Sequence, residues 1–272
     1  MPSAHNSLFE PVASKSFWGE RHTRFGHTGW ADPVIYAYDQ LERLSIIKAA
    51  ILGRQQSGGL ALDFGCGTGD FSKLLLSLGF TVCGYDPYVQ PQIHSPQFTY
   101  ASTCADIPFG DKSLDLVLSV TVLDHILDDR LLNAALKSFH RLLKHGGVLS
   151  MMEYALDSNV ERERLGLRNE YQAFRSLDEW KYLLDRHSFR ILSVSPVPHP
   201  TFSPSPGYCA YARSNLVRLL RWTSGAPRPL VWRDGILKRH AAKCMKENSA
   251  KFGVDFTEVR LSPIKLIECT PT

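Results

Sequence analysis

The stretch Leu62-Asp63-Phe64-Gly65-Cys66-Gly67-Thr68-Gly69-Asp70 decides the fold of this chain. A short apolar run leads into it, and a helix pattern follows at 70–78 until Gly79. Glycines between a strand and a helix let the backbone bend sharply and come close to a ligand. The stretch therefore predicts a ligand-binding turn at the end of a strand, and we call residues 65–69 the glycine loop.

The acids around the glycine loop favour a cofactor without phosphates. Asp70 stands where a dinucleotide fingerprint has its last glycine, and a carboxylate there would repel a pyrophosphate at the helix N-terminus. Asp86 ends the next strand pattern, where an acid can accept hydrogen bonds from both hydroxyls of a ribose. Pro87 and Tyr88 are then expected to border the adenine.

Strand and helix patterns alternate along the chain. Strand patterns at 60–64, 80–85, 98–101, 114–120, 148–153, 190–197 and 264–270 are interleaved with helix patterns at 70–78, 129–144 and 177–186. Parallel strands need long crossovers, so this order predicts an α/β, Rossmann-like, seven-stranded and mostly parallel sheet with helices on both faces. Ligands bind such sheets at the C-terminal ends of their strands.

The expected organisation is one domain with additions. We expect an N-terminal lid and first helix at 1–52, a core at 53–200, a helical insertion at 201–260 and a final core strand at 261–272. The insertion has helix patterns at 211–222 and 235–252. Such an insertion can also form a dimer contact, so a homodimer is one expectation for the assembly.

Composition narrows the class of protein. The chain has 272 residues, 44% of them hydrophobic, a net charge of +4, and no apolar run long enough for a signal peptide or a membrane span. Six cysteines without a CxxC pair indicate neither a zinc site nor a disulfide framework. A cytoplasmic protein is expected. Basic residues concentrate at 208–247, which favours either an anionic substrate or a solvated helix face.

These motifs resemble a known family. The sequence is similar to class I methyltransferases that use S-adenosylmethionine (SAM), of the ubiquinone/menaquinone-biosynthesis type, over about 61–197 and in the final strand. The resemblance implies that the backbone of Gly65, Cys66 and Gly67 wraps the methionine part of SAM, while Asp63 organises the loop and the amino group. It rests on the glycine loop, Tyr85-Asp86, Ile107-Pro108-Phe109 with the following Ser113-Leu114-Asp115-Leu116-Val117, and Leu142-Leu143-Lys144-His145-Gly146-Gly147.

One position departs from the family pattern. Thr103 stands where the family usually has an adenine-contacting Asp, and Asp106 follows three residues later. The resemblance then implies that backbone groups of Cys104 and Ala105 hold the adenine edge. Which side chain contacts the adenine amino group stays open.

Methyl transfer mainly requires alignment of the acceptor, at times with removal of a proton. The segment after the fourth strand, Val120-Thr121-Val122-Leu123-Asp124-His125, is similar to the family's "LEH" segment at the edge of the cofactor pocket. Val120 and Thr121 are therefore expected to border the cofactor. His125 is either a general base or a histidine that packs under the next helix.

Two further regions are candidates for contacts with the substrate. Residues 17–30 are rich in aromatics, histidine and glycine, and the resemblance implies that this region folds over the SAM pocket as a lid. Glu153 ends the fifth strand, where it would either pair with a cationic acceptor or cap the next segment. The candidate substrate residues are His27, Trp30, Tyr36, Glu153 and Tyr154, and Tyr38 is either a lid residue or core. His22 and His27 lack a nearby carboxylate pair, so no metal site is expected.

The leading hypothesis is a SAM-dependent methyltransferase that acts on nitrogen, oxygen or carbon of a small biosynthetic molecule. An RNA-modifying methyltransferase that grips phosphates with 208–247 is the alternative. A third possibility is a SAM-binding partner protein without transfer activity. No membrane partner is expected, and nucleic acid is the less favoured partner.

Overall fold

The computed structural model describes residues 14–30, 33–157, 171–198 and 264–272, together with positions 214, 216, 236, 239, 240 and 243. The chain forms two compact units. The first contains Met1–Thr28, Ile51–Ser195 and Pro263–Thr272, and the second contains Gly29–Ala50 and Pro196–Ser262. Most of the predicted insertion, including most of the basic segment, lies outside the described residues, so the predicted domain boundaries stay a prediction.

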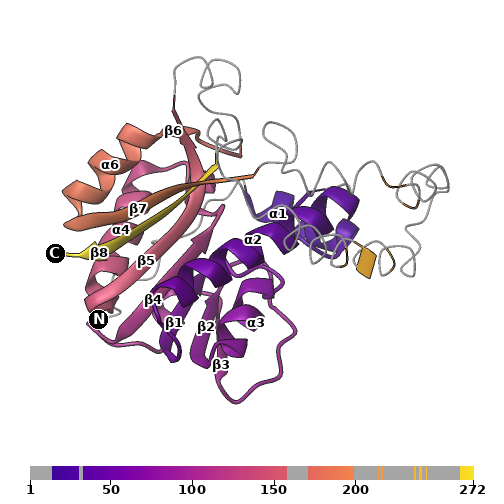
Figure 1. The fold of residues 1–272 in the computed structure, drawn as a ribbon, viewed down its shortest axis with the longest axis horizontal. Coiled ribbons are helices and arrows are strands. Elements are labelled where there is room, and N and C mark those ends of the chain that lie inside the picture. The colour runs from indigo at the N-terminus through magenta and orange to yellow at the C-terminus, as the bar shows by residue number, and fades with distance from the viewer. Residues whose placement is uncertain are drawn as a thin grey trace, which may run out of the picture. The chain divides into compact units, whose positions relative to one another are not determined.

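A mixed sheet forms the centre of the first unit (Figure 1). The strand order is β3-β2-β1-β4-β5-β8-β7, with β8 antiparallel to β5 and the pairs among the first five strands parallel. This arrangement confirms the predicted Rossmann-like class. The strands are β1 (Gly59–Phe64), β2 (Phe80–Tyr85), β3 (Phe98–Ala101), β4 (Leu114–Val120), β5 (Leu143–Leu156), β7 (Phe189–Val197), β8 (Ile264–Pro271) and the two-residue β6 (Arg175–Ser176), which pairs with β5.

The sheet register gathers the strand ends at one edge. Phe64 pairs with Tyr85 on β2 and with Ser119 on β4. The strand order reverses between β1 and β4, because the chain moves outward to β2 and β3 and then returns to the other side of β1. Open α/β sheets bind ligands at such a switch point, beyond the carboxyl ends of the strands.

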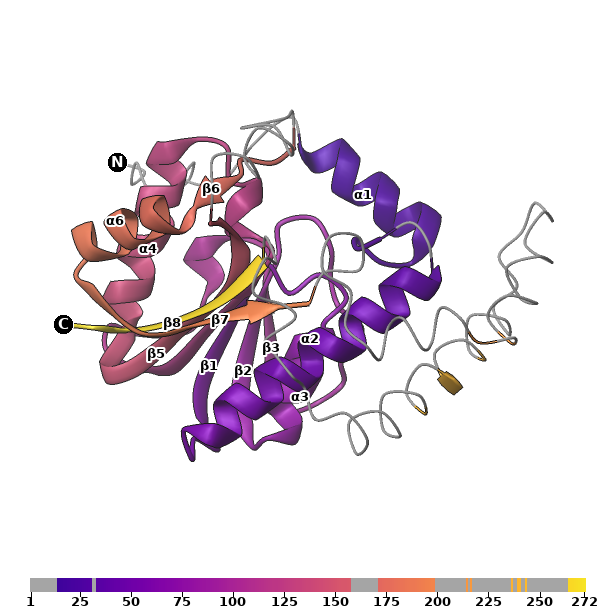
Figure 2. The same ribbon diagram turned by 45° about the horizontal axis from the view of Figure 1, so that its top comes forward.

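Helices cover both faces of the sheet in the first unit. Helix α3 (Asp70–Ser77) lies on one face, and α4 (Asp129–Leu142) and α6 (Leu177–Arg186) lie on the other (Figure 2). Right-handed crossovers require this, because β1 to β2 and β4 to β5 run in opposite directions across the sheet. The capping box of Ser176 and Glu179 begins α6: the serine hydroxyl accepts from the glutamate N–H, and the glutamate carboxylate accepts from the serine N–H.

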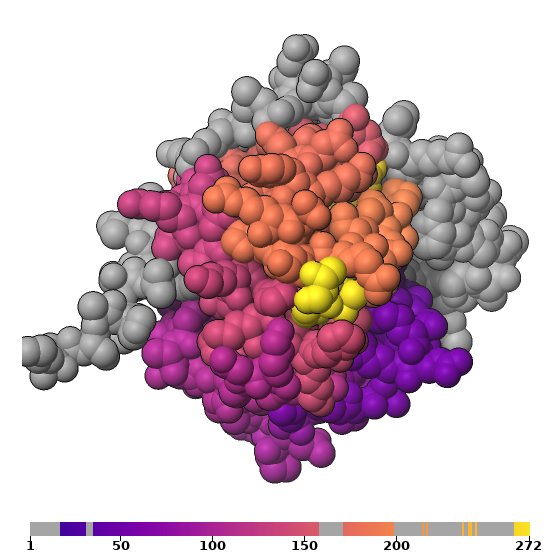
Figure 3. All heavy atoms as spheres, turned by 90° about the vertical axis from the view of Figure 1, so that its left-hand side faces the viewer, coloured from indigo at the N-terminus to yellow at the C-terminus, as the bar shows by residue number. Residues whose placement is uncertain are grey.

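The main hydrophobic core fills the space between the sheet and helices α4 and α6. It includes Trp180, whose ring nitrogen donates to the Tyr154 carbonyl at 2.7 Å. The C-terminal end of β8 lies beside α6 and β7 on the molecular surface (Figure 3), where the N–H of Thr272 donates to the Ser188 carbonyl at 2.9 Å. Fully buried core side chains include Leu62, Cys83, Leu114, Val117, Leu132, Leu136, Leu149, Met151, Trp180, Leu184 and Ile267.

Some boundaries differ from the sequence prediction. Helix α4 ends at Leu142, two residues before the predicted end, and β5 is longer than 148–153 because Leu143 already pairs with Leu114 across an irregularity. The expected N-terminal lid was helical, but the bounds of helix α1 (Ser14–Phe25) were not predicted, since its few apolar residues show no helical period. Short 3₁₀ turns, η1 (Cys104–Asp106) and η2 (Leu123–His125), follow β3 and β4.

The second unit is described mainly through α2 (Pro33–Gly53), whose first 18 residues belong to it. Trp30 donates its ring N–H to Asp39 at 2.9 Å, and Asp39 also pairs with Arg43 at 2.9 Å. Among the helices in the described ranges, none combines the length and the apolar composition that crossing a membrane requires.

Candidate functional site

The glycine loop is fixed to the end of β2. The N–H groups of Gly65 and Cys66 both donate to the Tyr85 carbonyl, at 2.7 and 2.9 Å. Gly65 has a φ of +77°, and a Cβ built on it would lie 2.3 Å from Val122 Cγ2. Only glycine fits this combination of left-handed backbone and close approach.

Asp86 follows the last residue of β2 and closes the glycine loop from that side. Its Oδ2 accepts the N–H of Gly67 at 3.0 Å, and its Oδ1 accepts the N–H groups of Tyr88 and Val89 at 2.8 and 2.9 Å. Burial raises the pKa of Asp86, and these hydrogen bonds oppose that effect because they favour the charged form. Pro87 is half-buried beside it.

Asp63 lies beneath the loop and faces α3. The Ser72 hydroxyl donates to its Oδ2 at 2.6 Å. Burial raises the pKa of Asp63 to about 7, and the charges of Asp86 and Asp70 act in the same direction. Three acids thus surround the glycine loop. These three acceptors do not fit a pyrophosphate, whereas they fit a cofactor that carries cationic ammonium and sulfonium groups and ribose hydroxyls.

The expected adenine region is the η1 turn after β3. The Thr103 hydroxyl donates to Asp106 Oδ2 at 2.7 Å. Thr103, which departs from the family pattern, is therefore hydrogen-bonded to the acid three residues later. Burial raises the pKa of the half-buried Cys104 thiol to about 11, and a hydrogen bond with Tyr85 opposes that effect. Ala105 and Asp106 are exposed.

Helix α1 and the residues after it lie near the glycine loop at one end and near His125 at the other. Thr28 Oγ1 lies 3.4 Å from the position of a Cβ on Gly67. At the other end of the segment, Phe17 stacks on Tyr171 with ring centroids 4.1 Å apart, and Trp18 meets His125 edge-on at 4.7 Å. The density of aromatics at 17–30 was the sequence signal for this contact.

The segment after β4, residues 121–126, is called the post-β4 loop here. Val120 is half-buried at the end of β4, and Thr121 adopts a φ of +50°. The Thr121 N–H donates to the Met152 carbonyl on β5 at 2.7 Å. The chain therefore turns sharply at the end of β4 while it keeps a backbone bond to β5.

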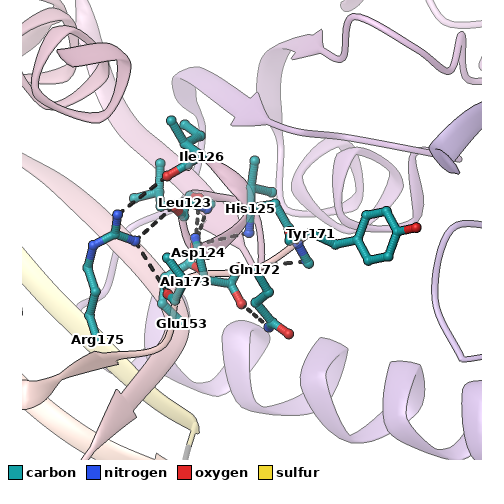
Figure 4. Close-up of polar contacts among 11 residues, drawn as sticks. Leu123, Asp124, His125, Ile126, Glu153, Tyr171, Gln172, Ala173 and Arg175 are labelled. Atoms are coloured by element: carbon teal, nitrogen blue, oxygen red, sulfur yellow. Dashed lines mark hydrogen bonds and ion pairs between the residues drawn. The ribbon is translucent and has the colours of Figure 1, made fainter. Parts of the chain in front are cut away.

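His125 lies at the end of the post-β4 loop with both ring nitrogens near protein groups (Figure 4). Its Nδ1 lies 2.7 Å from the Tyr171 carbonyl oxygen, which only accepts, so Nδ1 carries the proton of this bond. Its Nε2 lies 3.8 Å from Asp124 Oδ1. In the neutral ring, Nε2 is therefore the nitrogen with the free lone pair.

Glu153 was predicted to end the fifth strand, but β5 continues to Leu156 and Glu153 lies within it, fully buried. Its Oε1 accepts the Ser119 hydroxyl at 3.0 Å and the N–H groups of Val122 and Leu123 at 3.2 and 3.1 Å. Its Oε2 accepts the N–H of Asp124 at 3.3 Å. Burial, together with the neighbouring Asp124 charge, raises the pKa of Glu153 well above its ordinary value. Both carboxylate oxygens are thus bound by donors of this chain.

A second contact holds the post-β4 loop from the segment 171–175. Gln172 donates its side-chain amide to Asp124 Oδ2, and the Ala173 N–H donates to the Asp124 carbonyl at 2.7 Å. The Arg175 guanidinium reaches backbone carbonyls of the same loop at 3.4 Å. No local motif marks partners that are about 50 positions apart in the sequence. The sequence analysis therefore missed Asp124, Tyr171, Gln172 and Arg175.

The other candidate substrate residues are divided between the two units, with His27 and Tyr154 in the first and Trp30 and Tyr36 in the second. The ring of His27 lies 6.1 Å from that of Phe25, and Tyr154 meets Phe174 edge-on at 5.0 Å. Tyr36 and Tyr38 are buried, and with Trp30 they belong to the second unit. Within the described ranges, no three His, Cys, Asp or Glu side chains form a group that could hold a metal ion.

Comparisons with known proteins agree on one family. Residues 36–194, more than half of the chain, match the family model described as a methyltransferase domain. An uncharacterised methyltransferase of Synechocystis is 34% identical over 107 residues, which cover 38% of this chain and 50% of the relative. A probable tRNA methyltransferase 9B of mouse is 29% identical and covers 40% of this chain and 24% of the relative.

A ubiquinone/menaquinone biosynthesis C-methyltransferase of Pseudoalteromonas translucida is 29% identical over 161 residues, 53% of this chain and 62% of the relative. The chain therefore spans between about a quarter and two thirds of these relatives. Among solved structures, the 1,6-didemethyltoxoflavin N1-methyltransferase of Burkholderia thailandensis, with bound S-adenosylhomocysteine, has a TM-score of 0.51 and 19% identity. It covers 68% of this chain and 80% of that one, which shows a shared fold.

Proposed function

This chain belongs to the methyltransferase domain family, whose cofactor is SAM, and we propose that it methylates a small-molecule acceptor at nitrogen, oxygen or carbon. When SAM is bound, the acceptor would attack the sulfonium methyl group in line, so that a bond from the acceptor to the methyl carbon forms, the carbon–sulfur bond breaks and S-adenosylhomocysteine leaves. The observation that carries the proposal is the joining of the glycine loop to Asp86, through the bond from the Gly67 N–H. That bond places a carboxylate beside a backbone cradle at the switch point of the sheet.

Each residue of the cofactor side has a proposed role. The backbone of 65–67 wraps the methionine part, and Asp63 keeps the loop in place through Ser72. Asp86 accepts hydrogen bonds from the ribose hydroxyls with the lone pairs that its backbone donors leave. Pro87, Val120 and Thr121 border the cofactor, and the backbone of Cys104, Ala105 and Asp106 holds the adenine edge.

The chemistry asks the protein chiefly to align the acceptor. His125 is the candidate general base, through the lone pair of Nε2. Its Nδ1 is bound to Tyr171 and its Nε2 faces Asp124, so no ring nitrogen is directed away from the protein. This geometry favours the alternative in which His125 packs and orients the loop.

The groups beside the post-β4 loop favour a small molecule over RNA. Phe17, Trp18 and Tyr171 place aromatic rings there, and the nearby acids Asp124 and Glu153 are buried. Phosphate backbones are bound by exposed lysines and arginines instead. The RNA alternative draws on the basic segment 208–247 and on likeness to a protein named as a tRNA methyltransferase. The quinone-biosynthesis subtype is a finer proposal that one distant relative supports.

The proposal is tested by calorimetric titration of the full chain with SAM and with S-adenosylhomocysteine. We expect saturable binding, weakened in Asp86→Ala by about tenfold or more, because a charged hydrogen-bond acceptor contributes about 1.5–3 kcal/mol. Asp178→Asn, an exposed acid on α6, is the control and should bind like the wild type. Absence of binding by the wild-type protein would contradict the proposed function.

Labelled SAM then separates the acceptor classes. Transfer to a small-molecule extract but not to total tRNA is expected. Transfer to tRNA that falls steeply with salt would favour the RNA alternative, because phosphate contacts weaken with salt. Binding of SAM without transfer to either pool would favour the partner-protein alternative.

A further inference from the structure

Beyond Thr121, the post-β4 loop is anchored by a side chain instead of by a strand partner. The backbone N–H groups of Val122, Leu123 and Asp124 all donate to the Glu153 carboxylate. The Ser119 hydroxyl on β4 donates to it as well. Four donors therefore converge on one buried carboxyl group. Buried amides need an acceptor. Because strand β4 has ended at this point, the Glu153 carboxyl group takes the place of a neighbouring strand.

The anchored loop touches the glycine loop. Val122 Cγ2 lies 2.3 Å from the position that a Cβ on Gly65 would take, so the valine occupies the space that the missing side chain leaves. The N–H of Val122 is one of the amides that Glu153 holds. Glu153 is therefore hydrogen-bonded directly to Val122, the residue that lies against the backbone of Gly65.

A second acid extends the same anchor in the other direction. Asp124 gives its N–H to Glu153 and accepts the Gln172 side-chain amide with Oδ2, and its carbonyl accepts the Ala173 N–H. The next residue, His125, is bonded to the Tyr171 carbonyl. The segment 171–173 is therefore tied to the loop by three hydrogen bonds (Figure 4).

We propose that Glu153 and Asp124 are positioning residues for methyl transfer, which hold the post-β4 loop between the glycine loop and the segment 171–173. This inference rests on the proposed function. Neither acid contacts the acceptor: Glu153 acts through Val122 on the glycine loop, and Asp124 acts through Gln172 on the wall that carries Tyr171. The expectation that Glu153 pairs with a cationic acceptor is replaced by an internal role.

The chemistry of the anchor makes a sharp distinction between two substitutions. Glu153→Gln keeps an acceptor oxygen at the Oε1 position, beside the Ser119, Val122 and Leu123 donors, but its NH₂ group cannot accept the Asp124 N–H. Glu153→Ala removes both acceptors and leaves buried N–H groups without partners. The glutamine variant should therefore rescue most of what the alanine variant loses.

The test measures amide hydrogen exchange by NMR and affinity for S-adenosylhomocysteine in the full chain, for both Glu153 variants, Asp124→Asn and the control Asp178→Asn. In Glu153→Gln, the Asp124 amide should exchange about tenfold faster or more, while the amides of Val122 and Leu123 stay protected. Affinity should fall about tenfold or more in Glu153→Ala and less than about threefold in Glu153→Gln.

Each outcome decides the inference. Protection of all three amides at wild-type level in Glu153→Gln, or wild-type affinity in Glu153→Ala, would overturn it. If Glu153→Ala fails to fold, the amide pattern of the glutamine variant still decides. If the wild-type chain binds no S-adenosylhomocysteine, the proposed function fails separately, and the amide pattern still tests the anchor.

Discussion

The proposed cofactor side and the proposed acceptor side of the first unit are built in different ways. On the cofactor side, the glycine loop and Asp86 belong to one β-α-β unit, and their contacts join consecutive elements. On the acceptor side, Glu153 holds residues about 30 positions earlier, and Gln172 reaches Asp124 across nearly 50. A motif in the sequence therefore identifies the first site, whereas the second exists only after the chain has folded.

The largest effect should follow a change at the point where the two sides meet. In Gly65→Ala, the added Cβ would collide with Val122 and the residue would keep a left-handed φ. We expect loss of S-adenosylhomocysteine binding and a decrease of about 2–6 kcal/mol in the free energy of unfolding, from strain and overpacking together. Calorimetry and urea unfolding measure these two quantities.

Gly110→Ala is the matched control, since no atom lies within 4 Å of a Cβ at that glycine. Its binding and stability should stay close to the wild type. If Gly65→Ala behaved like this control, Val122 would not lie against the glycine loop, and the contact between the two sides would be disproved.

A medium effect is expected from Asp63 and depends on pH. Burial raises its pKa from 3.8 to about 7, so between these values the folded state holds a proton that the unfolded state has released. The free energy of unfolding should therefore fall as pH rises from about 4 to 7, by up to about 4 kcal/mol at 1.4 kcal/mol per pKa unit.

Asp63→Asn removes this titration while it keeps an oxygen for the Ser72 hydroxyl. Urea unfolding from pH 5 to pH 8 should show the variant gaining stability relative to the wild type up to about pH 7 and no further. A constant difference across that range would show that Asp63 does not carry the proton.

The smallest effect is expected at His125. Its ring nitrogens face Tyr171 and Asp124, so His125→Gln should lower the rate of methyl transfer by less than about tenfold, once an acceptor is found. A general base would contribute about 10²–10⁴-fold. A loss of that size, with unchanged cofactor affinity, would assign the base to His125 and reject the packing interpretation.

The sequence predicted the fold well where local patterns decide it. The strands at Phe80–Tyr85, Phe98–Ala101 and Leu114–Val120 were predicted at their observed bounds, and the SAM cofactor is confirmed with the family. The apolar runs sufficed for β2 and β4, because most of their residues are buried, whereas β3 is a weaker pattern with only Ala101 buried.

Non-local packing explains what the sequence did not predict. Helix α1 lacks an apolar period, since its main contacts are single rings, Phe17 on Tyr171 and Trp18 on His125. Glu153 was a candidate substrate ligand because the sequence of a strand does not show whether an acid faces solvent or four internal donors. Only the register of β4 and β5 brings those donors to it.

The most direct test of the account is an NMR titration of the ¹⁵N-labelled chain with S-adenosylhomocysteine. The largest amide shifts should fall at Gly65 and Gly67, at Asp86 to Val89 and around Cys104, with a smaller change at Val122. Shifts confined to other regions, or no shifts at all, would contradict a cofactor site at the glycine loop.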